Sequence, residues 1–282
     1  MIRPGMRALL IGGAVLIVML ASSLGMYYPT RTAENAARLS GDATIPDRID
    51  VTAWVTHIDT TNGTVSVSIS SLEPHGSFAD ESGMFRDDVH LNASTSLSAP
   101  SVSVKRGEVA PDIDERFGLT GVVTDYPFDR YTATLDIRIL DSAGNEVPTA
   151  ITLFSTDPFF AMSDSDDDAG LINLTFTRST PTMVYALFVM VLMLGLAIAA
   201  ATAAYYILHG RRGLLFPACS MMAAMLFALV PLRNAVPGNP PIGSVIDFGS
   251  FFIAEIVISV SLIASVMIGH HFERANERSK ST

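Results

Sequence analysis

Apolar residues follow two different patterns along this chain. Four stretches are continuously apolar, whereas the region between the first and second alternates single apolar residues with polar ones. A helix needs about 20 apolar residues to cross the hydrocarbon core of a bilayer, and each stretch approaches or exceeds that length. The pattern therefore predicts four membrane spans, one before and three after a water-soluble block, at residues 8–28, 183–208, 214–232 and 245–268.

The block between the first two spans has the alternation of β-strands. Val51, Ala53 and Val55 alternate with polar neighbours, and the alternation resumes after Asn62-Gly63, a dipeptide typical of hairpin turns. About eight short strands without helical periodicity between them favour an antiparallel β-sandwich. Beyond this hairpin, strands are predicted at residues 89–95, 101–105, 117–123, 131–139, 149–155 and 171–177.

Together the two patterns predict an α+β membrane protein. An extracytoplasmic antiparallel β-sandwich is expected on a four-helix transmembrane region, with one N-terminal and three C-terminal spans. We expect an N-terminal anchor at residues 1–28, a linker at 29–46 with one short helix near 33–39, the β-sandwich at 47–182, a three-helix bundle at 183–270 and a tail at 271–282.

Basic residues predict the orientation in the membrane. Lys and Arg beside short loops favour the cytoplasmic side, and here three basic clusters flank the same end of the four spans. Both termini are therefore expected in the cytoplasm of a multi-pass plasma-membrane protein, with residues 29–182 outside. The basic residues concerned are Arg3, Arg7, Arg211, Arg212, Arg274, Arg278 and Lys280.

Charge and motifs limit the classes of partner. The predicted outer block holds 24 Asp and Glu side chains against 10 Lys and Arg, and such an acidic surface repels nucleic acid. The chain also lacks a glycine-rich phosphate-binding loop, so we expect neither nucleic acid nor a nucleotide as a partner.

The first apolar stretch has a second interpretation. Arg7, the apolar run and the small residues at 21–23 also describe a cleaved secretory signal. The apolar run continues past this point, however, and Tyr28 closes it as an interfacial aromatic residue does. An uncleaved anchor is favoured, and cleavage stays the alternative.

Three charged residues in the predicted membrane half form a candidate intramembrane charge site. Arg233 and Asp247 border a Pro- and Gly-rich loop, so they can pair across it as a structural clamp or take part in a functional site. Glu255 stands ten residues into the last span, near the bilayer centre. It is either a proton or cation site or a neutral acid hydrogen-bonded to Ser or Thr of a neighbouring helix. The i, i+4 spacing predicts that Asp247, Phe251 and Glu255 share one helical face.

The segment Tyr126-Pro127-Phe128-Asp129 is a candidate contact between the outer domain and the membrane. An exposed Phe128 costs free energy in water unless it packs on a neighbour or dips toward lipid. The four residues resemble a turn in the extracellular sandwich of pentameric ligand-gated channels, which rests there on the transmembrane domain. This chain lacks the flanking cysteine pair and the fourth C-terminal span of those channels.

Other polar clusters favour structural interpretations. The acidic stretch at 163–170 lacks the full spacing of a calcium loop, so a solvated loop is favoured over a cation site. The histidines have no metal-ligand spacing, and Cys219 is expected to be a packing residue. We find no nucleophile and base motif, and we therefore expect no catalytic residue, metal or cofactor. The histidines of the outer block are His57, His75 and His90.

The turn at Tyr126 to Asp129, the loop from Arg233 to Asp247 and the order of one span plus three resemble an uncharacterised family of bacterial membrane proteins, domain of unknown function 4436. The resemblance implies a cell-membrane protein with an external β domain and three C-terminal spans. It implies no activity and no catalytic residues.

Two functions from different classes are expected. The favoured one is a scaffold or accessory subunit of a membrane assembly, with the lipid bilayer and either membrane-protein partners or further copies of this chain as its contacts. The alternative is a transport or channel-like component that uses Glu255 with Asp247 and Arg233. An enzyme is the least favoured class.

Overall fold

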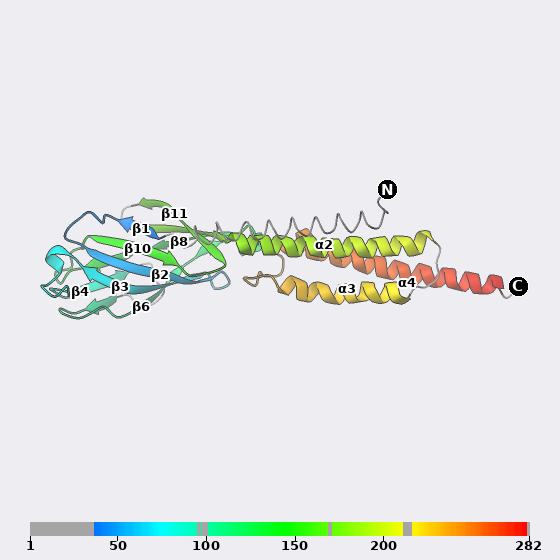
Figure 1. The fold of residues 1–282 in the computed structure, drawn as a ribbon, viewed down its shortest axis with the longest axis horizontal. Helices are drawn as coiled ribbons and strands as arrows, with labels where there is room; N and C mark the ends of the chain where they lie inside the picture. Colours follow the sequence, from blue (N-terminus) through cyan, green and yellow to red (C-terminus); the bar gives the residue numbers. More distant parts are fainter. Residues whose placement is uncertain (1–36, 95–96, 98–100, 169–170, 211–215, 281–282) are drawn as a thin grey trace, which may run out of the picture. The chain divides into compact units, whose positions relative to one another are not determined.

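The structure, a computed structural model of the 282-residue chain, describes residues 37–94, 97, 101–168, 171–210 and 216–280. These residues form two compact units. The β unit contains the described residues up to Val122 together with Phe128–Pro181. The helical unit contains Val123–Pro127 together with the described residues from Thr182 onward. The chain is therefore of mixed α+β class, with its long described helices after the strands (Figure 1).

The described strands of the β unit form three sheets. In the five-stranded sheet the order is β1 (Arg38–Gly41), β10 (Thr149–Ser155), β2 (Ile49–Asp59), β3 (Thr64–Pro74) and β6 (Ile113–Gly118). In the four-stranded sheet it is β11 (Phe160–Asp168), β12 (Leu171–Arg178), β8 (Arg130–Leu135) and β7 (Thr120–Gly121). In the three-stranded sheet it is β5 (Ser101–Val104), β4 (Val89–Ala93) and β9 (Ile137–Leu140).

The predicted hairpin at Asn62-Gly63 joins β2 and β3. The Asp59 carboxylate accepts hydrogen bonds from the backbone N–H groups of Thr61 at 3.0 Å and Asn62 at 2.9 Å, which closes the turn. Gly63 has a φ of 64°, a conformation that suits glycine. On either side of this turn, alternate residues such as Val51 and Val67 are buried, as the period of two predicts.

One strand pair differs from the antiparallel expectation. Strand β10 runs parallel to β2, with Thr149 opposite Ile49 and Ser155 opposite Val55. Hairpin-linked strands must pair antiparallel, but a strand that returns after a long connection can enter a sheet in either direction. The prediction of a purely antiparallel domain is wrong for this pair.

Two further predictions about local structure also change. Residues 38–41 of the expected linker form β1, which pairs antiparallel with β10, so the short helix expected near 33–39 does not include Arg38 and Leu39. The remainder of that expected helix, residues 33–36, lies outside the described residues. The acidic stretch at 163–170 was expected to be a loop, yet β11 extends through Asp168 along β12.

The predicted strand at 131–139 is divided at Asp136. Strand β8 before it pairs with β12, and β9 after it pairs with β4, in different sheets. The Asp136 carboxylate is buried and accepts hydrogen bonds from Arg138 Nε at 2.6 Å and from the Ser94 hydroxyl. A buried carboxylate requires such partners, and meeting this requirement separates two strands that the alternation pattern alone joins.

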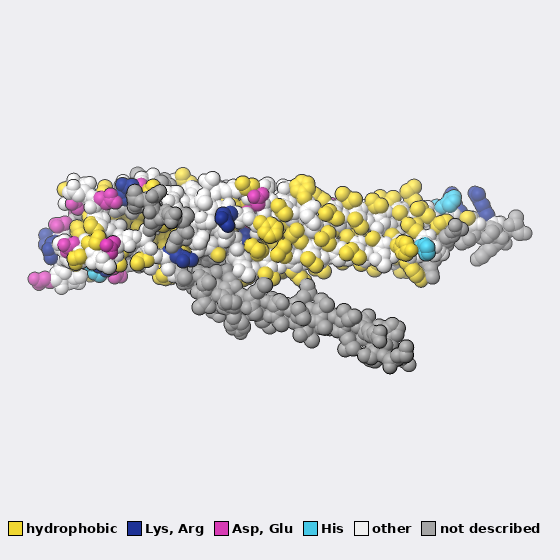
Figure 2. Space-filling model, turned by 90° about the horizontal axis from the view of Figure 1, so that it is seen from above, with side chains coloured by type: hydrophobic (Ala, Val, Ile, Leu, Met, Phe, Trp, Pro, Cys, Tyr) yellow, Lys and Arg dark blue, Asp and Glu magenta, His cyan; other side chains and the backbone are white. Residues whose placement is uncertain are grey.

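The helical unit contains three helices long and apolar enough to cross a membrane. They are α2 (Thr180–His209), α3 (Phe216–Asn234) and the last helix, which begins with a π-helical turn, η3 (Asp247–Phe251), and continues as α4 (Phe252–Lys280). Figure 2 shows hydrophobic side chains gathered over these helices. The expected first span at 8–28 lies outside the described residues. The expected tail is helical from its first residue, because α4 continues through it to Lys280.

The three helices share one apolar core. Buried residues recur every three or four positions in α2, among them Val189, Met193 and Ala197. Met222 and Leu229 of α3 and Ala254 and Ile258 of α4 belong to the same cluster. Tyr126 also belongs to this apolar cluster. It follows the short 3-10 turn η2 (Val123–Asp125), in the segment of the chain between β7 and β8.

Candidate functional site

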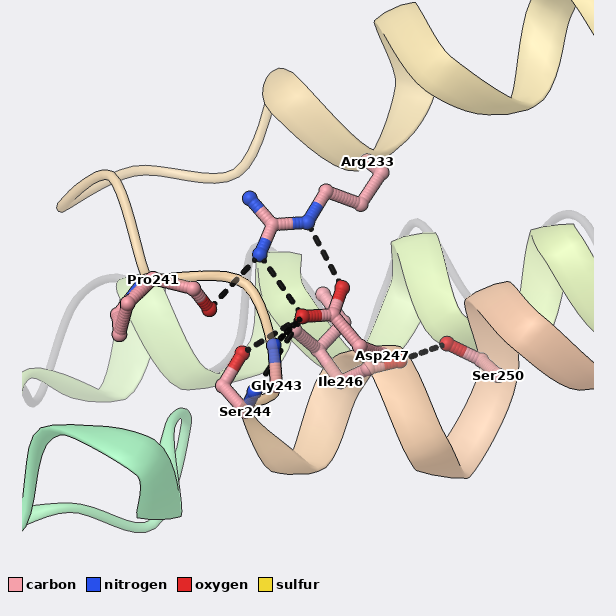
Figure 3. Close-up of polar contacts among 7 residues, drawn as sticks. All are labelled: Arg233, Pro241, Gly243, Ser244, Ile246, Asp247 and Ser250. Atoms are coloured by element: carbon pink, nitrogen blue, oxygen red, sulfur yellow. Dashed lines mark hydrogen bonds and ion pairs between the residues drawn. The ribbon is translucent and has the colours of Figure 1, made fainter.

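Arg233 and Asp247 form a two-point ion pair between the end of α3 and the start of the last helix (Figure 3). Arg233 Nε donates to Asp247 Oδ1 at 2.8 Å, and Arg233 Nη2 donates to Asp247 Oδ2 at 3.0 Å. Asp247 is 1% exposed and Arg233 is 9% exposed. The planar guanidinium matches the carboxylate at both oxygens, so the geometry of the pair is strongly directional.

The loop between the two helices folds around the same carboxylate. Asp247 Oδ2 also accepts hydrogen bonds from the backbone N–H groups of Gly243 at 2.7 Å and Ser244 at 3.3 Å, and from the Ser244 hydroxyl at 3.4 Å. Arg233 Nη2 additionally donates to the Pro241 carbonyl at 3.0 Å. Figure 3 shows these bonds converging on Asp247. The pair therefore fixes the loop as well as the two helix ends.

The ends of the two helices favour these charges. Helical backbone begins at Val245, two residues before η3, so Ser244 is the residue that precedes the helix. Asp247 accepts a hydrogen bond from the Ser244 N–H as the acid of a capping box does. A negative charge at a helix N-terminus and a positive charge in a last turn each interact favourably with the helix dipole. Each charge is thus neutralised by its partner and stabilised by a helix end. The chemistry of this arrangement is that of a structural clamp.

Glu255 is not part of this cluster. It is exposed on α4, in a shallow hollow of about 390 Å³ lined by Phe252, Glu255, Ile256, Ser259 and Val260. Across the ranges that the structure describes, no hydrogen bond or ion pair joins Glu255 to Arg233 or Asp247.

Asp247, Phe251 and Glu255, which are expected to share one helical face, differ in burial. Asp247 is buried, Phe251 is half-buried and Glu255 is exposed. Asp247 is covered by Arg233 and by the loop at Gly243 and Ser244, whereas Glu255 lies about two turns farther along the helix and outside that cluster.

The segment Tyr126-Pro127-Phe128-Asp129 is divided between the two units. Tyr126 is 0% exposed in the core of the helical unit, to which Pro127 also belongs. Phe128 and Asp129 belong to the β unit, where Phe128 is 56% exposed and Asp129 is 1% exposed. Of the two aromatic side chains in this segment, Tyr126 is buried and Phe128 is exposed. The role of the segment as a contact with the membrane stays a prediction.

Arg178 is a partner of Asp129 that the sequence reasoning missed. Its Nε donates to both carboxylate oxygens at 3.0 Å, and its Nη2 donates to Oδ2 at 2.8 Å. Both side chains are almost completely buried. A signal was present in the sequence, because Ile172, Leu174 and Phe176 place every second residue of β12 inside and Arg178 continues that row.

Two aromatic side chains complete this buried pair. Tyr131 donates its hydroxyl proton to Asp129 Oδ2 at 2.8 Å, and the Arg178 guanidinium lies 4.2 Å from the centre of the Phe160 ring. Burial, together with the hydrogen bond to Asp129, raises the pKa of the Tyr131 phenol above its ordinary value. Tyr131 therefore remains a neutral donor, which a buried carboxylate requires.

Other polar candidates are dispersed. His75 Nε2 lies 2.9 Å from Asp50, and His57 Nδ1 lies 3.7 Å from Asp157, while His90 is exposed on β4. In the described part of the chain, no three His, Cys, Asp or Glu side chains are placed to hold a metal ion. The side chains of Asp164 to Asp168 lie outside the described residues, so the alternative of a cation site there stays a prediction. Cys219 is half-buried beside the helical core.

Comparison with known families divides the chain at β12. Residues 39–177 match the family described as domain of unknown function (DUF4436), and residues 178–271 match the domain of unknown function (DUF8686). No curated protein sequence matches the chain. The boundary between the two matches precedes Arg178 and lies close to the boundary between the β unit and the helical unit.

Proposed function

Through residues 39–177 this chain belongs to the DUF4436 family, and we propose that it is a scaffold or accessory subunit of a membrane assembly in the cell envelope. The proposed form is an extracytoplasmic β-sandwich joined to four membrane spans, with both termini in the cytoplasm. The proposed contacts are the lipid bilayer and either membrane-protein partners or further copies of the chain.

The observation that carries this proposal is the state of the Arg233–Asp247 pair. A site that moves a proton or an ion needs groups that change charge or partner during the cycle. Here both charged groups are buried, bonded to each other and bonded to the loop that joins their helices. Such a pair stabilises one fixed arrangement of two helices, as a scaffold protein requires.

The location in the membrane is supported by three long apolar helices and by the charges that follow them. Arg274 and Arg278 lie near the end of α4, on the side that the distribution of basic residues assigns to the cytoplasm. The β-sandwich is supported by fully buried rows in all three sheets, represented by Val51, Leu91 and Leu174.

Co-purification tests the proposed function. The full chain with a C-terminal tag is extracted from its native membrane in a mild detergent and separated by size. A complex of defined stoichiometry, with a partner or with further copies, is the expected result. A monomer that carries only lipid under several mild detergents contradicts the proposal. Labelling of single introduced cysteines from either side of the membrane, in a Cys219→Ser background, tests the orientation separately.

One observation favours transport as a second candidate. Glu255 is an acid on an otherwise apolar helix face, and in a span such residues commonly mark an ion or proton pathway. Flux of protons and monovalent cations into proteoliposomes tests this candidate with Glu255→Gln. Flux that depends on Glu255 supports transport, while no flux, or flux that is equal in the variant, excludes this role of Glu255.

A further inference from the structure

The exposed face of α4 around Glu255 requires a cover if the helix spans a membrane. In the described residues Glu255 lies in a hollow between Phe252 and Val260, and apart from Ser259 the side chains that line it with Glu255 are apolar. An ionisable group near the bilayer centre costs about 2.5–3.5 kcal/mol on insertion scales when it has no protein or water around it. Such residues therefore face protein or a water-filled cavity.

The shape of this face suits a closely packed neighbouring helix. Ser259 stands one turn after Glu255, and its small side chain leaves a depression between Phe252 and Val260. In membranes, helices approach closely where small residues meet, and hydroxyl groups hydrogen-bond across the contact. The occupant should accordingly offer small residues and a hydroxyl group at the depth of Glu255.

We propose that the first predicted span of this same chain, residues 8–28, packs on the Glu255 face of α4 and places Ser22 or Ser23 beside the Glu255 carboxyl group. This inference rests on the four-span topology of the proposed function. The stretch has 21 residues, which as a helix extend about 31 Å and match a hydrocarbon core of about 30 Å.

The hydroxyl groups of Ser22 and Ser23 are expected at nearly the same depth in the membrane as the Glu255 carboxyl group. Ser22 and Ser23 precede Tyr28 at the outer boundary by six and five residues, which is about 8–9 Å along a helix. Glu255 follows Asp247 at the outer boundary of the last span by eight residues, which is about 12 Å. The difference is less than one helical turn. Ala21 and Gly25 stand beside the two serines and offer the small surface that close packing requires.

A tethered occupant is favoured over a second copy of the chain. The first span is covalently joined to the described residues, so it is present at a high effective concentration at any expression level. A second copy that covers the same face loses translational and rotational freedom on association.

The single cysteine of the chain permits a clean cross-linking test. In a Cys219→Ser background, Ser22→Cys is combined with Phe252→Cys, which lines the same hollow and lies at the depth of Ser22, and a protease site is introduced at residues 29–36. Membranes are oxidised, treated with the protease and analysed without reduction. We expect the two fragments to stay joined and to separate after reduction. Leu10→Cys with Phe252→Cys is the matched control and should not join them, because Leu10 lies near the opposite membrane boundary.

Each outcome decides the inference. Fragments that stay joined in the Ser22→Cys pair and not in the Leu10→Cys pair support it. Cross-linked dimers formed by Phe252→Cys alone identify a second copy as the occupant and overturn it. Fragments that separate in every variant, or a mature chain that lacks residues 8–28, also overturn it. The orientation and co-purification experiments are read independently, so failure of this packing is distinguishable from failure of the proposed function.

Discussion

Asp129 and Arg178 are 49 residues apart in the sequence, yet they form a buried ion pair at the two points where the chain passes between its units. Asp129 stands two residues after Pro127, the end of a segment that belongs to the helical unit. Arg178 ends β12, four residues before the helical unit resumes at Thr182. The pair therefore ties together the two segments of the β unit that lead to and from the helices.

Removing one charge of this pair should destabilise the β unit. Asp129→Ala leaves the Arg178 guanidinium buried without its carboxylate, and breaking a buried pair in this way costs about 3–5 kcal/mol. Limited proteolysis of the detergent-solubilised full chain along a urea series measures the loss. Asp114→Ala, an exposed acid on β6, is the control and should change stability little. Equal resistance in Asp129→Ala and the parent would contradict the assignment.

Replacing both charged residues at once tests whether the ion pair itself stabilises the protein or whether only the loss of one partner destabilises it. Asp129→Leu with Arg178→Met removes both buried charges, and such exchanges are often neutral or stabilising. We expect the double variant to be more stable than Asp129→Ala. A double variant as unstable as the single one would indicate that the hydrogen bond from Tyr131 carries more of the stability than the ion pair.

Asp247 should contribute more to the stability of the helical unit than Arg233. Asp247→Ala removes the ion pair and also the acceptor of the Gly243 and Ser244 N–H groups, whereas Arg233→Ala leaves those two bonds in place. We expect a loss of about 3–5 kcal/mol for Asp247→Ala. Thermal exposure of the Cys219 thiol to a fluorescent maleimide in detergent measures it, because Cys219 packs beside the helical core. Arg274→Ala, at an exposed position, is the control. A lower stability for Arg233→Ala than for Asp247→Ala would contradict this prediction.

Tyr126 and Phe128 should differ sharply although they are neighbours in the sequence. Tyr126→Ala creates a cavity in the helical core and should cost about 3–5 kcal/mol, as truncation of a buried aromatic residue does. Phe128→Ala acts on an exposed side chain and should change stability by about 0.5 kcal/mol or less. The Cys219 thiol assay compares the two variants directly. Equal losses would show that Phe128 is buried in the protein as it exists in the membrane.

The stability of the β unit should fall in acid. Burial raises the pKa of Asp136, but hydrogen bonds from Arg138 and Ser94 lower it by more, so the folded pKa lies below the ordinary value of 3.8. A depressed folded pKa contributes stability above the unfolded pKa, and this contribution is lost as pH falls through the folded value. Unfolding measured between pH 7 and pH 2 should therefore show a loss that begins near pH 4.

Asp136→Asn isolates this contribution. The variant should be less stable than the parent at pH 7, and the difference should shrink as the pH falls from about 4, where the unfolded carboxylate begins to be protonated, through the lower pKa of the folded state. The exposed Asp114→Asn provides the comparison for a general change in net charge. A difference between Asp136→Asn and the parent that is constant across the whole pH range would exclude the linkage.

Several features of the fold could be predicted because they depend on near neighbours in the sequence. The β2–β3 hairpin follows from alternation and Asn62-Gly63, and β10 was predicted with its observed ends, Thr149 and Ser155. The long apolar helices likewise follow from composition, since only length and hydropathy are needed to recognise them. Sequence position also placed Arg233 and Asp247 at facing helix ends, where the structure has them bonded.

Features that depend on distant residues were missed. The division of a predicted strand at Asp136 depends on Ser94, and the parallel pairing of β10 joins it to β2, a strand that lies far away in the sequence. Arg178 was overlooked because a charged residue at a strand end is usually exposed, and only the position of Asp129 makes its burial favourable.

The sequence by itself determined the class of the protein: alternation specifies strands, and long apolar runs specify helices that can cross a bilayer, because both signals are local. Only the tertiary structure decided which charges meet. It joined Asp129 to Arg178 and Asp247 to Arg233, and it left Glu255 outside that second pair. The physical reason is that a buried charge is stable only beside its partner, and the partner is chosen by the three-dimensional path of the chain.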